Sequence, residues 1–100
     1  MLKHVVAWKI KDHAEGNTRE ENICIIRERL FNLKTIIPQI QSMEFGINLS
    51  KDENSYDAIL QIDFANTEDL EIYQVHPAHK EVSNFVSKVR TDRFLFDYEY

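Results

Sequence analysis

The chain has 100 residues, of which 43% are hydrophobic and 29% charged, with only two glycines and two prolines. This length predicts a single domain over residues 1–100, and the composition excludes a disordered chain. The formal net charge of −5 argues against nucleic acid as a partner, because nucleic-acid-binding surfaces are rich in lysine and arginine. No apolar stretch is long enough to cross a membrane, and a single cysteine cannot form an internal disulfide, so we expect a cytoplasmic protein.

The first predicted element is a strand over residues 2–11, where apolar and polar positions alternate. Period-two alternation with β-branched and aromatic residues is typical of a half-buried strand. On its more apolar face His4 points inward, and Trp8 is either part of the core or the wall of a pocket. That face consists of Leu2, His4, Val6, Trp8 and Ile10.

A polar connection over residues 12–17 precedes the first predicted helix. Thr18 and Glu21 have the spacing of a capping box, in which each side chain accepts a hydrogen bond from the other residue's backbone N–H. Pro38 marks the end of this helix, and Cys24 is expected in the core because it lies in an apolar run. The apolar stripe at helical spacing consists of Ile23, Ile26, Leu30, Leu33 and Ile37, widened by Phe31 and Ile36.

Three more strands are predicted, at residues 42–49, 56–64 and 94–100. The first two of these flank a charged, turn-like segment, so a hairpin is the simplest connection between them. In the last strand Asp97 shares a face with Leu95, so we expect it to point towards the helices. The other face carries only aromatic side chains, which are Phe94, Phe96, Tyr98 and Tyr100.

Residues 66–89 predict a helix that is broken at Pro77. Proline has no amide hydrogen, and its fixed φ suits the first turn of a helix. The residue before it, His76, is pushed out of the helical region of backbone conformation. We therefore expect one helix from residue 66 or 67 to about residue 75, and a second helix that starts at Pro77.

A tyrosine and a histidine approach the same interior from either side of this bend. Tyr73 lies on the apolar face of the first helix, and His79 lies three residues before Val82 on that of the second. Histidine suits a general base near neutral pH, and a tyrosine hydroxyl suits a donor to a developing oxyanion. His79 is either a core histidine, a pocket group or, with His76, a metal ligand. We expect no metal or other cofactor, because zinc normally needs three or four protein ligands and nothing nearby completes the set.

The order strand, helix, strand, strand, helix, strand predicts an α+β fold of the ferredoxin-like, split βαβ type. Four antiparallel strands form one sheet, and the helices cover one face of it. The uncovered face carries the aromatic row of the last strand, beside Val5, Ala7 and Ile59. So large an apolar surface indicates an interface, and we expect a homodimer whose two sheets form a dimeric α/β barrel.

Three segments carry a family resemblance. The chain opens with Lys3-His4-Val5-Val6 followed by Trp8-Lys9-Ile10-Lys11, continues with Tyr73-x-x-His76-Pro77-x-His79, and ends with Phe96-Asp97-Tyr98. Together they resemble the stress-responsive dimeric α/β-barrel (Dabb) proteins over essentially the whole chain. The resemblance implies a ferredoxin-like protomer, a homodimer with a central barrel, and a small-molecule pocket between the sheet and the helices of each protomer.

The resemblance to a plant branch of that family, the polyketide cyclases, implies roles for single residues. Tyr73 and His79 match the acid–base pair that closes a linear poly-β-ketone by aldol condensation. Asp97 matches an aspartate that supports the histidine, so we expect it to contact His79 directly or through a water. His4 matches a histidine at the pocket.

The remaining expected ligand contacts are Trp8, Leu30, Leu60 and His76. The chain departs from the cyclases at Ala58, where they carry a pocket histidine. It also departs from them on the first helix, where Arg27 and Leu30 replace aromatic pocket walls. The cyclases' substrate is therefore not carried over to this chain.

Three functions stay open at this point. The first is a small homodimeric stress-responsive-type protein whose pocket binds a small molecule that the sequence does not name. The second is an acid–base enzyme on an enolisable carbonyl substrate, similar to the cyclases or to related cofactor-free monooxygenases. The third is a structural or interaction module whose interior is filled. A cavity beside Tyr73 and His79 would separate the first two functions from the third.

Overall fold

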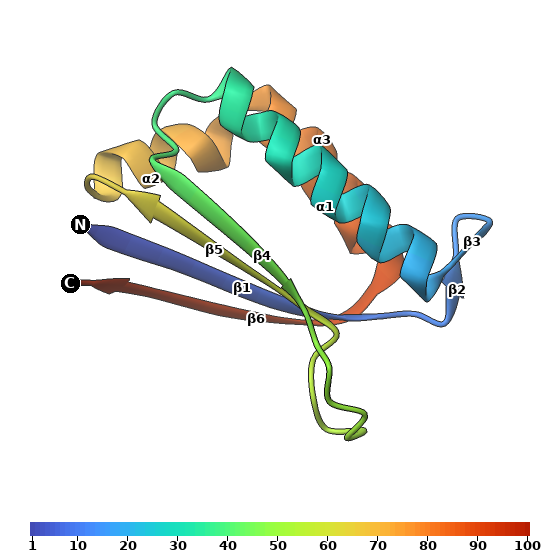
Figure 1. Cartoon of the computed structure of the whole chain (residues 1–100). Helices are drawn as coiled ribbons and strands as arrows, with labels where there is room; N and C mark the ends of the chain where they lie inside the picture. Colours follow the sequence, from blue (N-terminus) through green and yellow to red (C-terminus); the bar gives the residue numbers. More distant parts are fainter.

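Four strands form an antiparallel sheet, and three helices cover one of its faces (Figure 1). The computed structural model describes every residue from Met1 to Tyr100. The sheet has the order β4-β5-β1-β6, with the strands β1 (Leu2–Ile10), β4 (Ser42–Ile47), β5 (Ala58–Phe64) and β6 (Arg90–Glu99). The helices are α1 (Arg19–Ile36), α2 (Thr67–Val75) and α3 (Pro77–Val89), and β2 (His13–Ala14) pairs with β3 (Asn17–Thr18). The chain therefore has the predicted ferredoxin-like fold.

The predicted capping box begins α1. The Thr18 hydroxyl accepts a hydrogen bond from the backbone N–H of Glu21 at 3.3 Å, and the Glu21 carboxylate accepts one from that of Thr18 at 2.9 Å. Phe31 and Ile36 do not widen the buried stripe, because both side chains are exposed. The buried apolar residues of this helix are Ile23, Ile26, Leu30 and Leu33, and Ile37 is buried just beyond its end.

Cys24 is exposed, so the prediction that it belongs to the core is wrong. Ile23, one residue earlier, is buried. Successive residues of an α-helix are rotated by about 100°, so a run of consecutive apolar residues cannot all face the core.

His76 forms the joint between α2 and α3. Its backbone is extended, with φ −63° and ψ 132°, as the residue before a proline prefers. Its backbone N–H donates to the carbonyl oxygen of Tyr73 at 3.2 Å and so ends α2. Its ring Nδ1 accepts a hydrogen bond from the backbone N–H of Ala78 at 3.1 Å and so caps α3. The joint fixes the position of Tyr73, near the end of α2, relative to His79 in the first turn of α3.

The strand β6 begins at Arg90, whereas the sequence predicted a start at Phe94. The polar residues of this first part show no alternation, but they continue the hydrogen-bonded ladder with β1. In that ladder Arg93 lies opposite Trp8 and Arg90 lies opposite Ile10, with a register shift between Lys9 and Ile10. Pairing with a neighbouring strand therefore extends β6 beyond what its own pattern indicates.

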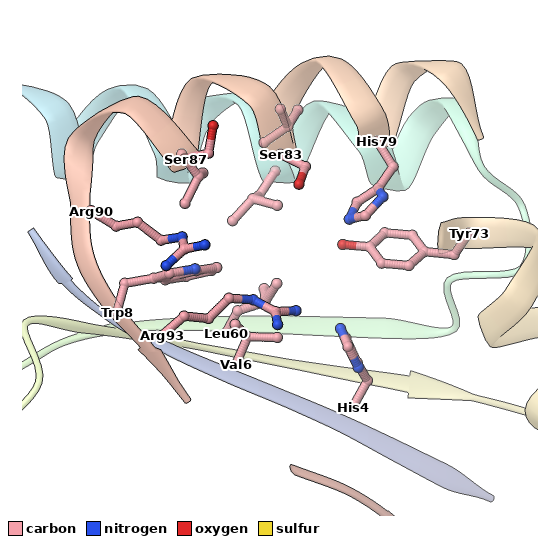
Figure 2. A pocket seen from close by; sticks show the side chains of 13 residues that line it. His4, Val6, Trp8, Leu60, Tyr73, His79, Ser83, Ser87, Arg90 and Arg93 are labelled. Carbon is pink, nitrogen blue, oxygen red and sulfur yellow. The ribbon is translucent and has the colours of Figure 1, made fainter. Parts of the chain in front are cut away.

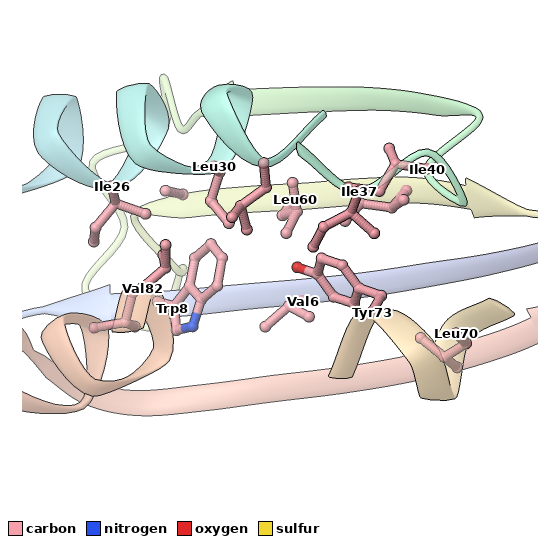
Figure 3. Packing of buried hydrophobic residues seen from close by; sticks show 14 of the residues in the cluster. Val6, Trp8, Ile26, Leu30, Ile37, Ile40, Leu60, Leu70, Tyr73 and Val82 are labelled. Carbon is pink, nitrogen blue, oxygen red and sulfur yellow. The ribbon is translucent and has the colours of Figure 1, made fainter. Parts of the chain in front are cut away.

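One apolar core fills the space between the sheet and the helices (Figure 3). In it Trp8 and Leu60 from the sheet lie near Leu30 from α1, and all three side chains are buried. The opposite face of the sheet has no helix over it, and there Phe96 is 54% exposed. None of the helices combines the length and the hydropathy that a membrane span requires.

Candidate functional site

A cavity of about 310 Å³ lies between the sheet and the helices (Figure 2). Pockets for small molecules usually measure about 300–1,000 Å³, so this one suits a small ligand. The predicted site residues that line it are His4, Trp8, Leu30, Leu60, Tyr73 and His79. The lining residues that the sequence analysis did not name as site residues are Val6, Val82, Ser83, Val86, Ser87, Arg90 and Arg93.

Tyr73 and His79 meet across the bend between α2 and α3. Their ring centroids are 4.3 Å apart, and the tyrosine hydroxyl points into the cavity (Figure 2). The Tyr73 residue is only 1% exposed. Burial raises the pKa of Tyr73 well above its usual range, more than the nearby Arg93 charge lowers it, so the hydroxyl stays protonated. It is therefore a hydrogen-bond donor to a group in the cavity.

The hydrogen bonding of His79 selects its tautomer. Ring Nδ1 lies 3.1 Å from the carbonyl oxygen of Gln74, and a carbonyl oxygen can only accept. Nδ1 therefore carries the hydrogen, and Nε2 keeps its lone pair. Burial lowers the pKa of His79 below its usual range, more than the bond to Gln74 raises it. A neutral imidazole with a free Nε2 is a general base at neutral pH.

Asp97 makes its direct contact with His4, which corrects the prediction of a direct contact with His79. The Nδ1–H of His4 donates to Asp97 Oδ1 over 2.6 Å. The two residues lie directly opposite one another on β1 and β6, so their side chains project from the same face of the sheet. The inference that Asp97 faces the helices was right, but its cross-strand neighbour is the closer histidine.

His4 is buried beside the tyrosine, with a ring-centroid distance of 5.9 Å and an edge-to-face arrangement. Burial lowers its pKa, and the hydrogen bond to Asp97 raises it by less. The neutral ring thus donates through Nδ1 and keeps Nε2 as an acceptor. Every fully buried side-chain nitrogen and oxygen has a hydrogen-bond partner. Because Nε2 of His4 has none within the protein, it is not fully buried and is accessible from the cavity that His4 lines.

One predicted ligand contact, His76, and one position that matches a pocket wall of the cyclases, Arg27, lie outside the lining. His76 was expected to contact the ligand, but it does not line the cavity, because its ring is engaged in capping α3. Arg27, at a position where the cyclases have an aromatic wall, is exposed and lies over the ring of Phe31. No group of three or more histidine, cysteine or acidic side chains is arranged to hold a metal ion.

Some of the missed residues had a signal in the sequence. Ser83 and Ser87 follow His79 at intervals of four, the spacing of one helical face. Arg93 shares its strand parity with Leu95 and Asp97, which face the helices. Arg90 had no such signal, because the register shift in the β1–β6 ladder is needed to place it.

Fold and site together define a ferredoxin-like domain with a polar pocket between its sheet and its helices. The model of the stress responsive A/B barrel domain matches residues 2–100 of the chain. The chain therefore belongs to that family, as the sequence resemblance predicted.

Three known proteins are similar to this chain over nearly its whole length. Olivetolic acid cyclase from Cannabis sativa is 26% identical over 99 residues, which cover 97% of this chain and 94% of the cyclase. A dimeric protein of unknown function from Bacteroides fragilis has a TM-score of 0.81 at 25% identity, with 99% of this chain and 95% of that chain covered. A hydroxynitrile lyase from Passiflora edulis has a TM-score of 0.83 at 16% identity, with 97% and 90% covered, and this likeness concerns the fold alone.

Proposed function

We propose that the chain is an acid–base enzyme that acts on a small enolisable carbonyl compound. The observation that carries this proposal is the pairing of Tyr73 and His79 in one cavity, each in the protonation state that the chemistry needs. The tyrosine is a protonated donor, and the histidine is a neutral base whose free nitrogen is Nε2. Pairs of groups whose environments set such different proton affinities are typical of acid–base sites.

The reaction begins at the carbon next to the carbonyl group. His79 Nε2 takes a proton from that carbon, and the electron pair of the broken C–H bond moves into the new C=C bond of an enolate. The Tyr73 hydroxyl donates a hydrogen bond to the oxygen on which the negative charge develops. The enolate carbon then takes the proton back from His79, or it attacks a second carbonyl carbon, as in an aldol closure. In the second case the electron pair of the C=O π bond moves to oxygen, and the resulting alkoxide takes the proton from His79.

His4 and Asp97 have a supporting role in this proposal. Asp97 holds the Nδ1–H of His4, which leaves Nε2 as an acceptor for a hydroxyl or enol group of the substrate. Edge-to-face contacts with Tyr73 and Phe64 keep the His4 ring in place. His4 is thus a binding residue, and Asp97 is a positioning residue that acts through it.

One relative supports a reaction of this kind by its name, which is olivetolic acid cyclase. A pocket that binds a small molecule without turnover is the second candidate, and the cavity supports it equally. The same cavity argues against a structural module with a filled interior.

We further propose that the chain is a homodimer whose sheets pack through the aromatic face. On that face Phe94, Phe96 and Tyr98 form a row of neighbouring rings with centroid distances of 6.3 and 5.8 Å. The Bacteroides fragilis relative is described as dimeric. A cytoplasmic location stays a prediction from the sequence.

Exchange of α-protons for deuterium tests the proposed enzyme without knowledge of its natural substrate. A panel of linear β-diketones and simple ketones in D₂O, followed by ¹H NMR, should include compounds whose exchange the protein accelerates. Proton transfer by a positioned side chain is typically worth about 10²–10⁴ in rate, so His79→Ala and Tyr73→Phe should each lose that order. His13→Ala, on the exposed β2, is the control and should keep the full rate. Full exchange in His79→Ala would disprove the assignment of the base.

A further inference from the structure

We propose that Arg90 and Arg93 make this cavity an anion-binding site, so that the carbonyl ligand carries a carboxylate. The substrate class, though not the anion site itself, rests on the proposed function above. Both arginines line the cavity, and Figure 2 shows both guanidinium groups directed into it. Arg90 lies at the end away from Tyr73 and His79, and Arg93 lies between.

A bulge in β6 brings the two arginines to the same face of the sheet. Residues three apart on a regular strand point to opposite faces. Here Arg93 lies opposite Trp8 and Arg90 lies opposite Ile10, two residues further along β1, because the register shifts between Lys9 and Ile10. The extra residue in β6 therefore turns Arg90 toward the helices beside Arg93. Bulges commonly re-aim side chains in this way next to functional sites.

The charged side chains that line the cavity are all positive. No aspartate or glutamate lines it, and neither Arg90 nor Arg93 takes part in an ion pair within the protein. Asp97, which lies on the same face of the sheet, is engaged by His4. The chain as a whole carries a formal charge of −5, so two unpaired cations at one cavity are a local exception to its acidic character.

The charge of Arg93 reaches the reactive groups. It lowers the pKa values of His4, Tyr73 and His79, although in each case burial has the larger effect. Arg90 is partly buried and Arg93 is exposed, so the arginine end of the cavity is open to an entering anion. An anion held there lies in the same cavity as the acid–base pair.

The guanidinium group favours a carboxylate. Its planar fork of N–H donors matches the two oxygens of a carboxylate in a bidentate pair, and such charge-assisted bonds are about twice as strong as neutral ones. Ser83 and Ser87 line the wall of α3 between His79 and Arg90. The Ser83 hydroxyl can hydrogen-bond a polar chain, whereas the Ser87 hydroxyl donates to the carbonyl oxygen of Asn84 at 2.7 Å and can only accept. A keto acid satisfies both ends of the cavity, with its carboxylate on the arginines and its ketone at Tyr73 and His79.

Binding of levulinate and of its methyl ester to the ¹⁵N-labelled protein, measured by NMR titration, tests the proposal. The two compounds share the ketone and differ in the negative charge. Charged hydrogen bonds contribute enough that levulinate should bind about tenfold tighter than its methyl ester, or more. Its binding should also change the NMR chemical shifts of Arg90 and Arg93. Arg90→Gln and Arg93→Gln should each remove most of this preference, and Arg93→Lys should restore only part of it.

Arg27→Gln is the matched control, because it removes the same charge from the exposed face of α1. If it weakens levulinate binding as much as Arg93→Gln does, the effect is one of net charge and the proposal is overturned. Equal binding of acid and ester also overturns it. Inorganic phosphate forms a third arm, and phosphate binding at the arginines without levulinate binding overturns the carboxylate assignment.

The same samples separate this proposal from the proposed enzyme. Arginine-dependent binding of levulinate without α-proton exchange would establish the anion site and contradict the acid–base function. Exchange of acid and ester at equal rates and equal affinities would support the function and contradict the anion site.

Discussion

The two faces of the sheet differ in what covers them and in what they carry. The face toward the helices holds a cavity with two histidines, a tyrosine and two arginines. The opposite face carries a row of exposed aromatic rings and has no helix over it. The strand β6 contributes to both, because its residues alternate between Arg93, Leu95 and Asp97 on one side and Phe94, Phe96 and Tyr98 on the other. Neighbouring residues of one strand can therefore contribute to the pocket on one face and to the proposed dimer interface on the other.

The largest effect is expected on the helix-covered face. His79→Ala and Tyr73→Phe should each lower the exchange rate by about 10²–10⁴, and the double variant should be little slower than the worse single variant. The reason is that an abstracted proton and a stabilised oxyanion belong to one transition state. The urea midpoint and the dimer mass should stay nearly unchanged. Strictly additive losses would indicate two independent roles.

The aromatic face should respond in the opposite way. Phe96→Glu should weaken the dimer by about a hundredfold or more, because an unpaired carboxylate in an interface is costly to bury. Light scattering after size exclusion measures the mass, and the protomer mass is 11.9 kDa.

Ile36→Glu is the control for this comparison. Ile36 is 51% exposed and Phe96 is 54% exposed in the protomer, so the same substitution meets similar solvent in an isolated chain. Only an interface over β6 makes the two variants differ. A wild-type protein that runs as a monomer at every accessible concentration would contradict the proposed dimer.

A smaller effect is expected from pH. The pKa of His79 is lowered in the folded protein, so the unfolded chain binds a proton more readily below about pH 6.5. The stability of the folded state should therefore fall as the pH drops through that range. The urea midpoint at about pH 5.5 and 7.5, in wild type and in His79→Gln, measures this. The variant should lose less stability on acidification, and an identical loss would contradict a half-buried, neutral His79.

The smallest effect is expected for Asp97→Asn, which distinguishes the two histidines. The hydrogen bond and the charge of Asp97 both raise the pKa of His4. Removing the charge should lower the pKa of His4 and leave that of His79 in place, because His79 is held by the Gln74 carbonyl. NMR titration of the ring protons would show the two responses. A shift confined to His79 would restore the contact that the sequence predicted.

The elements that sequence analysis placed correctly depend on local rules. The break at Pro77, the capping box at Thr18 and the alternation of β1 each follow from neighbouring residues, and together they define the fold. The cavity residues Tyr73 and His79 followed from the same helical spacing. The prediction of a direct contact between Asp97 and His79 failed because it depends on pairing across the sheet. The β1–β6 register places Asp97 opposite His4.

Local patterns also mislead where a second constraint acts on the same residue. Cys24 stands in an apolar run, but the turn of the helix exposes it. His76 looked like a pocket histidine, and its ring is instead used to cap α3. Arg90 reaches the cavity only because β6 bulges. This last placement depends on the pairing of β6 with β1, which no spacing in the sequence encodes by itself.

The protonation state of the His79 ring tests the central claim most directly, since it requires no substrate. Two-dimensional ¹H–¹⁵N NMR of the ring nitrogens, recorded across a pH series, reports the tautomer and the pKa together. The structure predicts a neutral ring at pH 7 with hydrogen on Nδ1, a free Nε2, and a pKa below 6.5. A ring that is protonated on Nε2, or that carries both protons at pH 7, would contradict His79 as the base.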